Sequence, residues 1–226
     1  MNRLPPGQRA RASFPRFGVP FAFRPLRKSA PSAIRIQGAL ARELEVAVAR
    51  LRDLRRKSLV ADFHCVTGWS AEGLRWGGVQ FRTFYTEVIV AEAEPRLGIS
   101  HVLFRGADGY RSILTIEDAL EEDVLLADEL DDRPLSEIHG APVRLVSPKQ
   151  YGYKSTKHLC AIEFHSVEPR DRYAHRSRRV LDVVLAAHPR ARVWEEERHR
   201  YLPAWGVRAL YRAMIAPTVR YWNRGN

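Results

Sequence analysis

The sequence predicts a mixed α+β domain with an extended N-terminal arm and a helical C-terminal extension. Short runs with strand character outnumber helical stripes, and the helical stripes do not alternate regularly with the strands. The chain of 226 residues, 45% of them hydrophobic, is long enough to bury one core of moderate size. The lack of regular alternation between helices and strands disfavours a doubly wound sheet. Nucleotide binding through a glycine-rich loop is also unsupported, because neither GxGxxG nor GxxxxGK(S/T) occurs.

Composition divides the chain into three segments. Residues 1–32 are rich in proline and arginine and form the predicted arm, in which several phenylalanines indicate packing on the body. Residues 33–167 form the predicted main domain, and residues 168–226 form a basic, helical extension.

The first half of the main domain has mostly strand patterns. Apolar and polar residues alternate at 33–36 and 44–48, as in half-buried strands. A charged connector at 50–57 leads to a predicted buried strand at 59–66, and 74–79 is typical of a short strand with a tight glycine turn.

The second half adds two helices and more strands. Apolar positions at 81–90 recur at helical spacing and predict a core-facing helix. Thr115 is the predicted N-cap of a short helix, with Asp118 three residues on. Cys160 is interpreted as a core residue on the last strand. Further strands are predicted at 100–104, 110–114, 124–127, 143–146 and 157–167.

The C-terminal extension has two amphipathic helix patterns, at 178–187 and 205–215, and Pro217 is predicted to end the second. One hypothesis is that this basic segment contacts a membrane surface or an electron-transfer partner. The alternative is a helix packed on the domain with its arginines directed outward.

Charge and cysteine content limit the functional classes. The net charge of +11 and pI near 10.2 raise a binding module for nucleic acid or a membrane surface as an alternative to an enzyme. Nucleic acid is the weaker choice, because an anionic cofactor would also use this charge. Two cysteines are too few for a disulfide scaffold or a cysteine zinc site. With no secretory signal and no apolar run of about 20 residues, a cytoplasmic location is expected.

Four segments carry residues suited to chemistry. Cys65 follows an apolar strand and precedes a glycine turn, where its thiol could hold a soft metal or serve only in packing. Asp108 lies in a glycine turn, and His139 and Arg144 flank a Gly-Ala-Pro turn. The glycine-hinged loop 151–157 is rich in N–H donors and lysines, a combination that suits a phosphate.

In this order, these segments resemble the molybdopterin-binding domain of the sulfite oxidase family, and most closely its bacterial haem-free members. The motifs are Phe-His-Cys-Val-Thr-Gly-Trp at 63–69, His-Gly-Ala-Pro-Val-Arg at 139–144 and Tyr-Gly-Tyr-Lys-Ser-Thr-Lys at 151–157. The resemblance extends over residues 34–167. It implies a molybdopterin oxidoreductase of the sulfite oxidase type, binding molybdenum–molybdopterin.

The resemblance also implies residue roles. Cys65 would be the protein ligand of molybdenum, and the pterin dithiolene would supply two further sulfurs. Residues expected to contact the pterin and its phosphate are Asp108, His139, Arg144, Ser155, Thr156 and Lys157, with Lys154 close by. Residues expected on the substrate side are Trp69, Ser70 and either Tyr151 or Tyr153. Arg16 of the arm could replace an upstream cofactor contact that has no clear equivalent.

The expected reaction is a two-electron oxygen-atom transfer to or from a small molecule, such as a sulfur oxyanion or a sulfoxide. Ser70 stands five residues after Cys65, where sulfite oxidases have an arginine, so sulfite itself is in question. No His-Pro-Gly-Gly haem motif occurs, and the extension is too short for an immunoglobulin-like domain. Electrons are therefore expected to be exchanged with a separate protein. The oligomeric state is not predicted.

Overall fold

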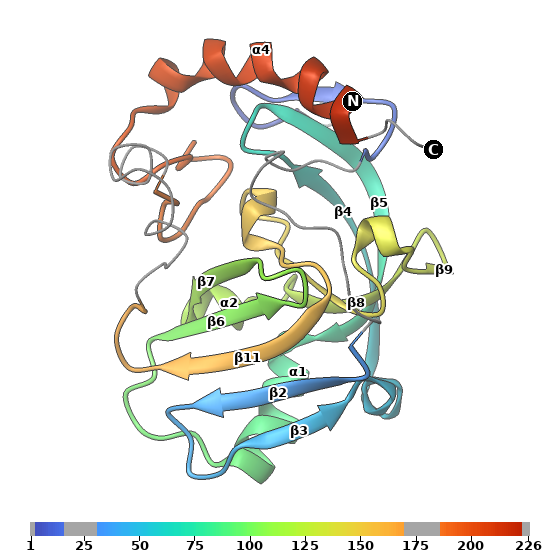
Figure 1. Ribbon diagram of the computed structural model, residues 1–226, viewed down its shortest axis with the longest axis vertical. Coiled ribbons are helices and arrows are strands. Elements are labelled where there is room, and N and C mark those ends of the chain that lie inside the picture. The colour runs from blue at the N-terminus through green and yellow to red at the C-terminus, as the bar shows by residue number, and fades with distance from the viewer. Residues whose placement is uncertain (1–2, 16–30, 170–185, 223–226) are drawn as a thin grey trace.

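The computed structural model describes residues 3–15, 31–169 and 186–222, which contain two β-sheets and few helices (Figure 1). A five-stranded sheet has the order β3 (Leu44–Ala47), β2 (Ala33–Gly38), β11 (Leu159–His165), β6 (His101–Gly106), β7 (Arg111–Thr115). A six-stranded sheet contains β1 (Arg9–Arg11), β4 (Arg56–His64), β5 (Trp69–Gln80), β8 (Leu125–Leu130), β9 (Arg133–Pro134) and β10 (Arg144–Val146). The predicted α+β class is confirmed.

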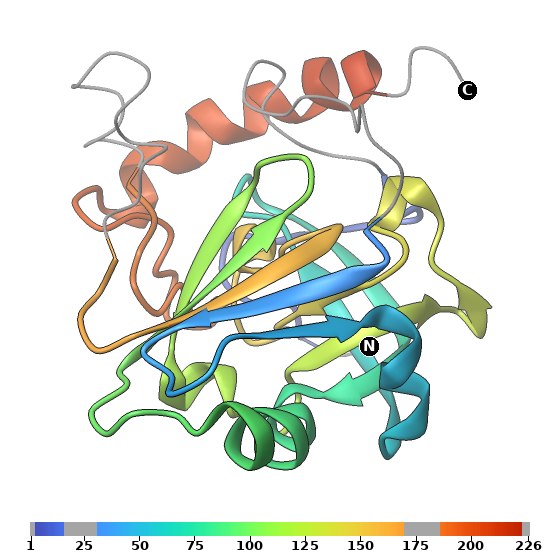
Figure 2. The same cartoon turned by 60° about the horizontal axis from the view of Figure 1, so that its bottom comes forward.

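Helices lie at the two ends of the molecule. The helix α1 (Phe81–Phe84) continues into a π-helix, η2 (Tyr85–Ala93), against one face of the five-stranded sheet (Figure 2). The long helix α4 (Ala204–Trp222) lies at the opposite end, above β4 and β5 (Figure 1). The short elements are η1 (Val48–Asp53), α2 (Ile116–Ala119), η3 (Glu137–His139) and η4 (Gly152–Lys154).

Two apolar clusters follow from this arrangement. The larger one, with Ile34, Phe81 and Phe104 fully buried, fills the space between the five-stranded sheet and the α1–η2 helix. The smaller one surrounds Trp69 and Trp76 of β5 and includes Cys65. The second cluster therefore brings the predicted metal ligand into a hydrophobic setting beneath α4.

Most predicted elements are present, with bounds that differ by a few residues. The helix at 81–90 is confirmed as α1 and η2, and the hydroxyl of Thr115 accepts the N–H of Asp118 at 3.1 Å, as the N-cap prediction requires. The predicted charged connector forms η1 and leads directly into β4. The helix predicted at 178–187 lies mostly outside the described residues.

Four structural predictions are wrong. The strand carrying Phe63 is not buried, because β4 pairs only with β5 and alternates exposed with half-buried residues. Gly77 and Gly78 form no turn, because β5 continues through them with a shift in its register against β8. A Cβ on Gly78 would lie 2.2 Å from the carbonyl oxygen of Leu126. Pro217 lies inside α4 and does not end it. Cys160 is half-buried on the outer face of β11 rather than in the core.

Candidate functional site

Cys65 begins the loop of the β4–β5 hairpin. Its N–H donates to the carbonyl of Trp69 at 2.8 Å, and the N–H of Gly68 donates back to the Cys65 carbonyl at 3.0 Å. Gly68 has a φ of +101°, a conformation that favours glycine and closes this short loop. The sequence Val-Thr-Gly after the cysteine therefore fixes where the thiol stands relative to both strands.

The thiol of Cys65 lies in an apolar and mostly closed environment. The residue is 7% exposed, and its sulfur lies 3.2 Å from the hydroxyl oxygen of Thr67. Burial raises the pKa of Cys65 to about 11, while hydrogen bonds from Thr67 and the charge of Arg198 act in the opposite direction. Without a cation on the sulfur, the thiol keeps its proton at neutral pH. A bound metal would favour the thiolate.

Both chain ends cover the hairpin loop. From the N-terminal side, Gln8 donates its amide N–H to the carbonyl of Cys65 at 3.1 Å, and β1 pairs with the start of β5. From the C-terminal side, Arg198 donates to the carbonyl of Val66. No sequence pattern predicted a role for Gln8 or Arg198, since nothing local distinguishes them from other polar residues of the chain ends.

Arg144 is the most deeply buried charged group of the site. Its side chain is 0% exposed, and its guanidinium donates to the backbone carbonyls of His139 at 3.0 Å and Ser155 at 3.2 Å. Its guanidinium carbon also lies 5.5 Å from the ring centroid of Phe63 and 5.2 Å from that of Trp76. Burial lowers the pKa of Arg144 to about 9, and no carboxylate is paired with it among the described residues.

Arg144 joins the predicted cofactor segments to one another. Its two carbonyl partners belong to the 139–144 turn and to the 151–157 loop. The backbone adds three more links: Leu145 N–H to Thr156, His158 N–H to Gly140, and Ala107 N–H to His158, at 2.8, 3.2 and 2.8 Å. The structure therefore brings the turn of Asp108, the His139 turn and the end of the loop together, although they are far apart in sequence.

His139 faces an aromatic side chain of the N-terminal arm. Phe14 stacks on the imidazole with a centroid distance of 4.7 Å and an interplanar angle of 13°, and it also contacts Phe63, Trp69 and Trp76. The Nδ1 atom of His139 is buried and has no hydrogen-bond partner among the described residues. Burial, followed by the charges of Lys157 and Arg144, lowers the pKa of His139 to about 4, so the ring is neutral at pH 7.

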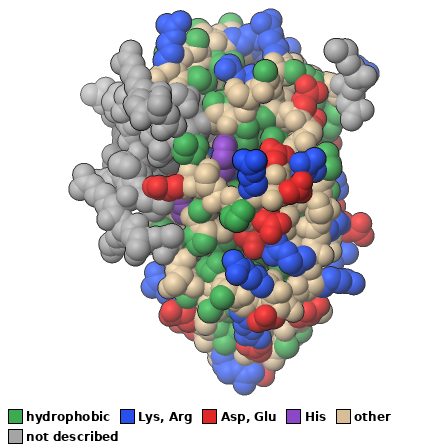
Figure 3. Space-filling view, turned by 90° about the vertical axis from the view of Figure 1, so that its right-hand side faces the viewer, with side chains coloured by type: hydrophobic (Ala, Val, Ile, Leu, Met, Phe, Trp, Pro, Cys, Tyr) green, Lys and Arg blue, Asp and Glu red, His purple; other side chains and the backbone are tan. Residues whose placement is uncertain are grey.

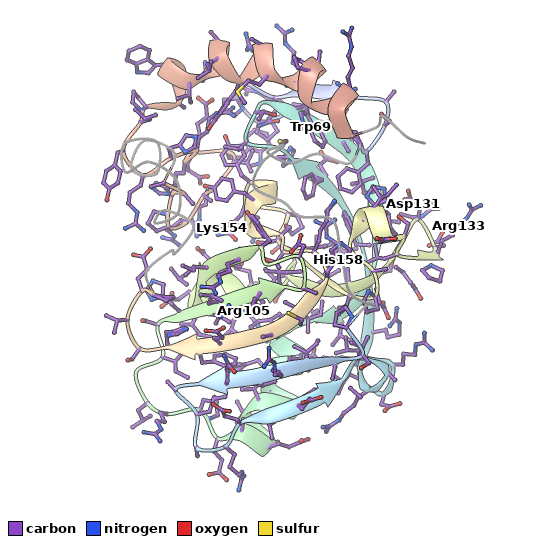
Figure 4. The ribbon with its side chains drawn as sticks, in the orientation of Figure 1. Trp69, Arg105, Asp131, Arg133, Lys154 and His158 are labelled. Carbon is purple, nitrogen blue, oxygen red and sulfur yellow. The ribbon has the colours of Figure 1, made fainter. Side chains whose placement is uncertain are left out.

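Phe63 connects the Cys65 hairpin to these loops. It lies two residues before Cys65, and a Cβ on Gly152 would come within 2.1 Å of its ring. Gly152 is therefore required for the close approach of the 151–157 loop to β4. Figure 4 shows Trp69 below α4, and Lys154 and His158 nearer the middle of the molecule.

Several predicted phosphate-binding side chains already have partners within the protein. The ammonium group of Lys154 donates to the carbonyls of Ile113 and Pro189. The hydroxyl of Ser155 accepts the N–H of Ser147 at 3.2 Å, and that of Thr156 lies 2.7 Å from the Ser112 hydroxyl. Lys157 donates to the carbonyl of Ile138 at 2.6 Å, and Asp108 accepts the N–H of Tyr110 at 2.9 Å. Their roles toward a phosphate stay predictions.

The residues predicted on the substrate side are mostly enclosed. Trp69 is 2% exposed, and the hydroxyl of Ser70, fully buried, donates to Gln8 at 3.1 Å and lies 2.7 Å from Nδ1 of His64. The hydroxyl of Tyr153 donates to the carbonyl of Arg198 at 3.1 Å and accepts the N–H of His188 at 3.2 Å. Arg16 lies outside the described residues, so its predicted role is untested.

Other parts of the described chain offer little competing chemistry. No group of three or more His, Cys, Asp or Glu side chains capable of holding a metal occurs among the described residues. A cavity of about 190 Å³ lies beside Arg56 and Glu129, near the end of β4 remote from Cys65. On the face shown in Figure 3, Lys and Arg are interspersed with Asp and Glu, and no single basic surface is visible. In the described part of the chain no helix is both long and apolar enough to cross a membrane.

Comparisons with known proteins show the family of this chain. A family model described as the oxidoreductase molybdopterin binding domain matches residues 25–173. The uncharacterized oxidoreductase YuiH of Bacillus subtilis is 30% identical over 166 residues, which cover 72% of this chain and 79% of YuiH. The protein-methionine-sulfoxide reductase catalytic subunit MsrP of Xanthomonas campestris is 29% identical over 150 residues, 61% of this chain and 46% of MsrP.

A solved structure shows the same fold. The sulfane dehydrogenase SoxCD of Paracoccus pantotrophus superimposes with a TM-score of 0.56 at 20% sequence identity, over 66% of this chain and 42% of the SoxCD chain. The chain thus spans less than half the length of both MsrP and that SoxCD chain.

Proposed function

The chain belongs to the oxidoreductase molybdopterin-binding domain family, and on that premise we propose that it binds molybdenum–molybdopterin and uses it for oxygen-atom transfer. The observation that carries the proposal is the buried guanidinium of Arg144. This cation joins the predicted cofactor segments through neutral carbonyls alone, and Phe63 packs between it and the Cys65 hairpin. A buried cation without a counter-ion destabilises an empty protein, and an anionic ligand would compensate it.

The donor set fits this cofactor. Cys65 supplies one soft sulfur ligand, and because the described residues hold no further metal-binding cluster, the remaining ligands would come from the pterin dithiolene. The buried Nδ1 of His139 and the indole N–H of Trp76 have no partners among the described residues, so both can bond a polar heterocycle. Glycines at 106, 140 and 152 let these loops pack closely, because a Cβ would meet Lys157 at the first two positions and the ring of Phe63 at the third.

Each group of residues would have its own role. Cys65 would hold the metal through its thiolate, while Asp108, His139 and Arg144 would orient the pterin and neutralise its charge. Ser155, Thr156 and Lys157 would hold the phosphate after exchanging present partners, since their side chains are already bonded and the N–H of Ser155 donates to the carbonyl of Gly152 at 3.1 Å. When bound, the molybdenum centre supplies two-electron oxygen-atom transfer. The apolar enclosure formed by Trp69 and Phe63 would exclude water from the metal.

We propose a sulfur oxyanion or a sulfoxide as the substrate. A relative named a methionine-sulfoxide reductase catalytic subunit and a structural neighbour named a sulfane dehydrogenase both support sulfur chemistry. The term catalytic subunit in the MsrP name also supports a separate electron-transfer partner. An assay panel of sulfite, sulfoxides and related oxyanions, with a dye as electron donor or acceptor, tests substrate and direction. The predicted cytoplasmic location is tested by cell fractionation.

Molybdenum analysis tests the cofactor assignment. Protein purified from a cofactor-competent host should contain molybdenum near one equivalent, and Cys65→Ser should lose it while keeping its circular dichroism spectrum. Cys160→Ser is the matched control, because this half-buried thiol lies on β11 and should not affect the metal. A folded wild-type protein without molybdenum, together with salt-sensitive binding of nucleic acid, would favour the basic binding module.

We further propose that α4 contacts an anionic membrane surface. The inner side of this helix packs on the domain through Val207 and Tyr211. The rest of its surface is apolar and basic: Trp205 is 77% and Leu210 60% exposed, and the helix contains arginines but no acidic residue. This composition matches acidic headgroups over an apolar interior.

Vesicle sedimentation tests that contact. Vesicles with phosphatidylglycerol should bind the full chain, neutral phosphatidylcholine vesicles should bind it less, and a Trp205→Ser, Leu210→Ser double variant should lose binding. Val60→Ser removes an equally exposed apolar side chain from β4 and serves as the control. Equal binding by the double variant would refute the role of α4.

A further inference from the structure

Arg198 lies beyond the family match, which ends at residue 173, yet it contacts two parts of the candidate site. Its Nη1 donates to the carbonyl of Val66, next to Cys65, and its guanidinium carbon lies 5.1 Å from the ring centroid of Tyr151. The side chain is only 1% exposed. Arg198 therefore bridges the Cys65 hairpin and the start of the 151–157 loop from inside the protein.

The charge of Arg198 is incompletely matched. The nearest carboxylate oxygen, from Glu196, lies 3.6 Å from Nη2, and the same carboxylate accepts the Nε–H of Arg208 at 3.0 Å. The Nε and Nη2 atoms of Arg198 are buried without a hydrogen-bond partner among the described residues. A buried N–H donor without a partner lowers the stability of the folded protein. A guanidinium presents such N–H groups as a planar fork suited to two oxygens.

The surroundings place this fork beside the predicted metal ligand. The Nη1 atom of Arg198 reaches the carbonyl of Val66, the residue that follows Cys65 in the hairpin loop. On the same side, Tyr211 of α4 is hydrogen-bonded to His199, and Ile215 packs against the apolar cluster that contains Cys65. The C-terminal segment thus covers the Cys65 hairpin and buries a partly unpaired cation beside it.

We propose that Arg198 is an oxyanion-binding residue, whose Nε–H and Nη2–H groups hold an anionic oxygen next to the Cys65 sulfur. The oxygen belongs either to a small oxyanion substrate or to the bound cofactor. Only this choice of source rests on the proposed function; the anion site itself is a property of the chain. In this view the extension beyond residue 173 contributes to specificity as well as to packing.

Binding of inorganic sulfate to the full, cofactor-free chain tests the site directly. At matched ionic strength, sulfate should raise the melting temperature of the wild type more than chloride does. Arg198→Gln should lose that increment, and Arg198→Lys, which keeps the charge but not the fork, should bind sulfate about tenfold more weakly. Glu196→Gln removes the competing carboxylate and should strengthen binding. Arg212→Gln, an exposed arginine of α4, is the matched control and should behave as wild type.

Two measurements on protein from a cofactor-competent host distinguish the sources. If the oxygen is the substrate's, Arg198→Gln keeps its molybdenum and raises KM for anionic substrates about tenfold or more, with a smaller change in kcat and none for neutral sulfoxides. If the oxygen is the cofactor's, molybdenum content falls while the sulfate increment of the empty wild type persists. A protein that never binds molybdenum defeats the proposed function but leaves the sulfate result intact.

The proposal is overturned if the wild type shows no increment specific to sulfate, or if Arg198→Gln retains it in full. Should Arg198→Gln fail to fold, the decision rests on Arg198→Lys and Glu196→Gln. Opposite changes in sulfate affinity support the site, and unchanged affinity in both refutes it. If Arg198 served only to anchor Val66, replacing Glu196 would not increase the affinity for sulfate.

Discussion

Replacing Arg144 by methionine separates a structural role from a ligand-binding role, because two opposing effects can be estimated. The lowering of its pKa from 12.5 to about 9 corresponds to a penalty of about 5 kcal/mol for the buried charge. Removing the guanidinium relieves that penalty but leaves the carbonyls of His139 and Ser155 without donors, at about 1–3 kcal/mol each. The effects offset each other, so Arg144→Met should change the unfolding free energy of the empty protein by less than about 3 kcal/mol.

The loaded protein should respond differently. An anion about 4 Å from this guanidinium gains roughly 4 kcal/mol at an effective dielectric constant near 20, or about a thousandfold in affinity. Arg144→Met should therefore lose most of its molybdenum. Urea denaturation of protein from a cofactor-deficient host measures the first effect, and metal analysis of protein from a competent host measures the second. Arg75→Met, which removes an exposed ion pair with Asp132, is the control for both.

One result would refute this reasoning. If Arg144→Met destabilised the empty protein by more than about 6 kcal/mol and yet kept its molybdenum, Arg144 would serve only to tie the loops together. The uncompensated charge would then be no sign of an anionic ligand.

Three further predictions use the same residues. Since the pKa of His139 is lowered to about 4, the unfolded chain binds a proton between pH 6.5 and 4 while the native ring does not. The unfolding free energy should therefore fall by up to about 3 kcal/mol as pH drops through this range. In His139→Gln, the urea midpoint should depend less on pH across the same range. Lys154→Met should lower the unfolding free energy in urea by about 2 kcal/mol, because it removes the donor for two half-buried carbonyls, whereas Lys157→Met should chiefly lower molybdenum content. Equal stability losses would contradict this division. In cofactor-free Cys160→Ser protein, alkylation of Cys65 should be slow at pH 8 and rise toward pH 11, and fast labelling at pH 8 followed by mass spectrometry would contradict the burial argument.

Local pattern was sufficient to predict most of the fold. Alternation at 33–36 and 157–167 predicted β2 and β11, because one face of each strand packs on the core and the other does not. The glycine after Cys65 predicted the turn that positions the thiol. The order of the cysteine, histidine and lysine motifs was enough to indicate the family, which the family match confirms.

Pattern failed where one residue's environment depends on a distant backbone. Gly78 predicted a turn, but this position requires glycine because the backbone of Leu126 in β8 leaves no room for a Cβ. Lys154 signalled a phosphate, but its ammonium group reaches the carbonyls of Ile113 and Pro189. In both cases the residue type alone did not identify the neighbour. Only the packing decided that the glycine meets a crossing strand and that the lysine meets backbone carbonyls.

The same distinction holds at Cys65. The sequence alone determined the cysteine and its turn, and it predicted the role of a soft thiolate ligand. Only the tertiary structure brought Gln8 and Arg198 against the hairpin, the latter across a separation of 132 residues. No local periodicity predicts such contacts, because they form only when segments from opposite ends of the chain pack over one buried loop. Burial of Arg198 in that packing leaves it a partly unpaired cation beside the sulfur.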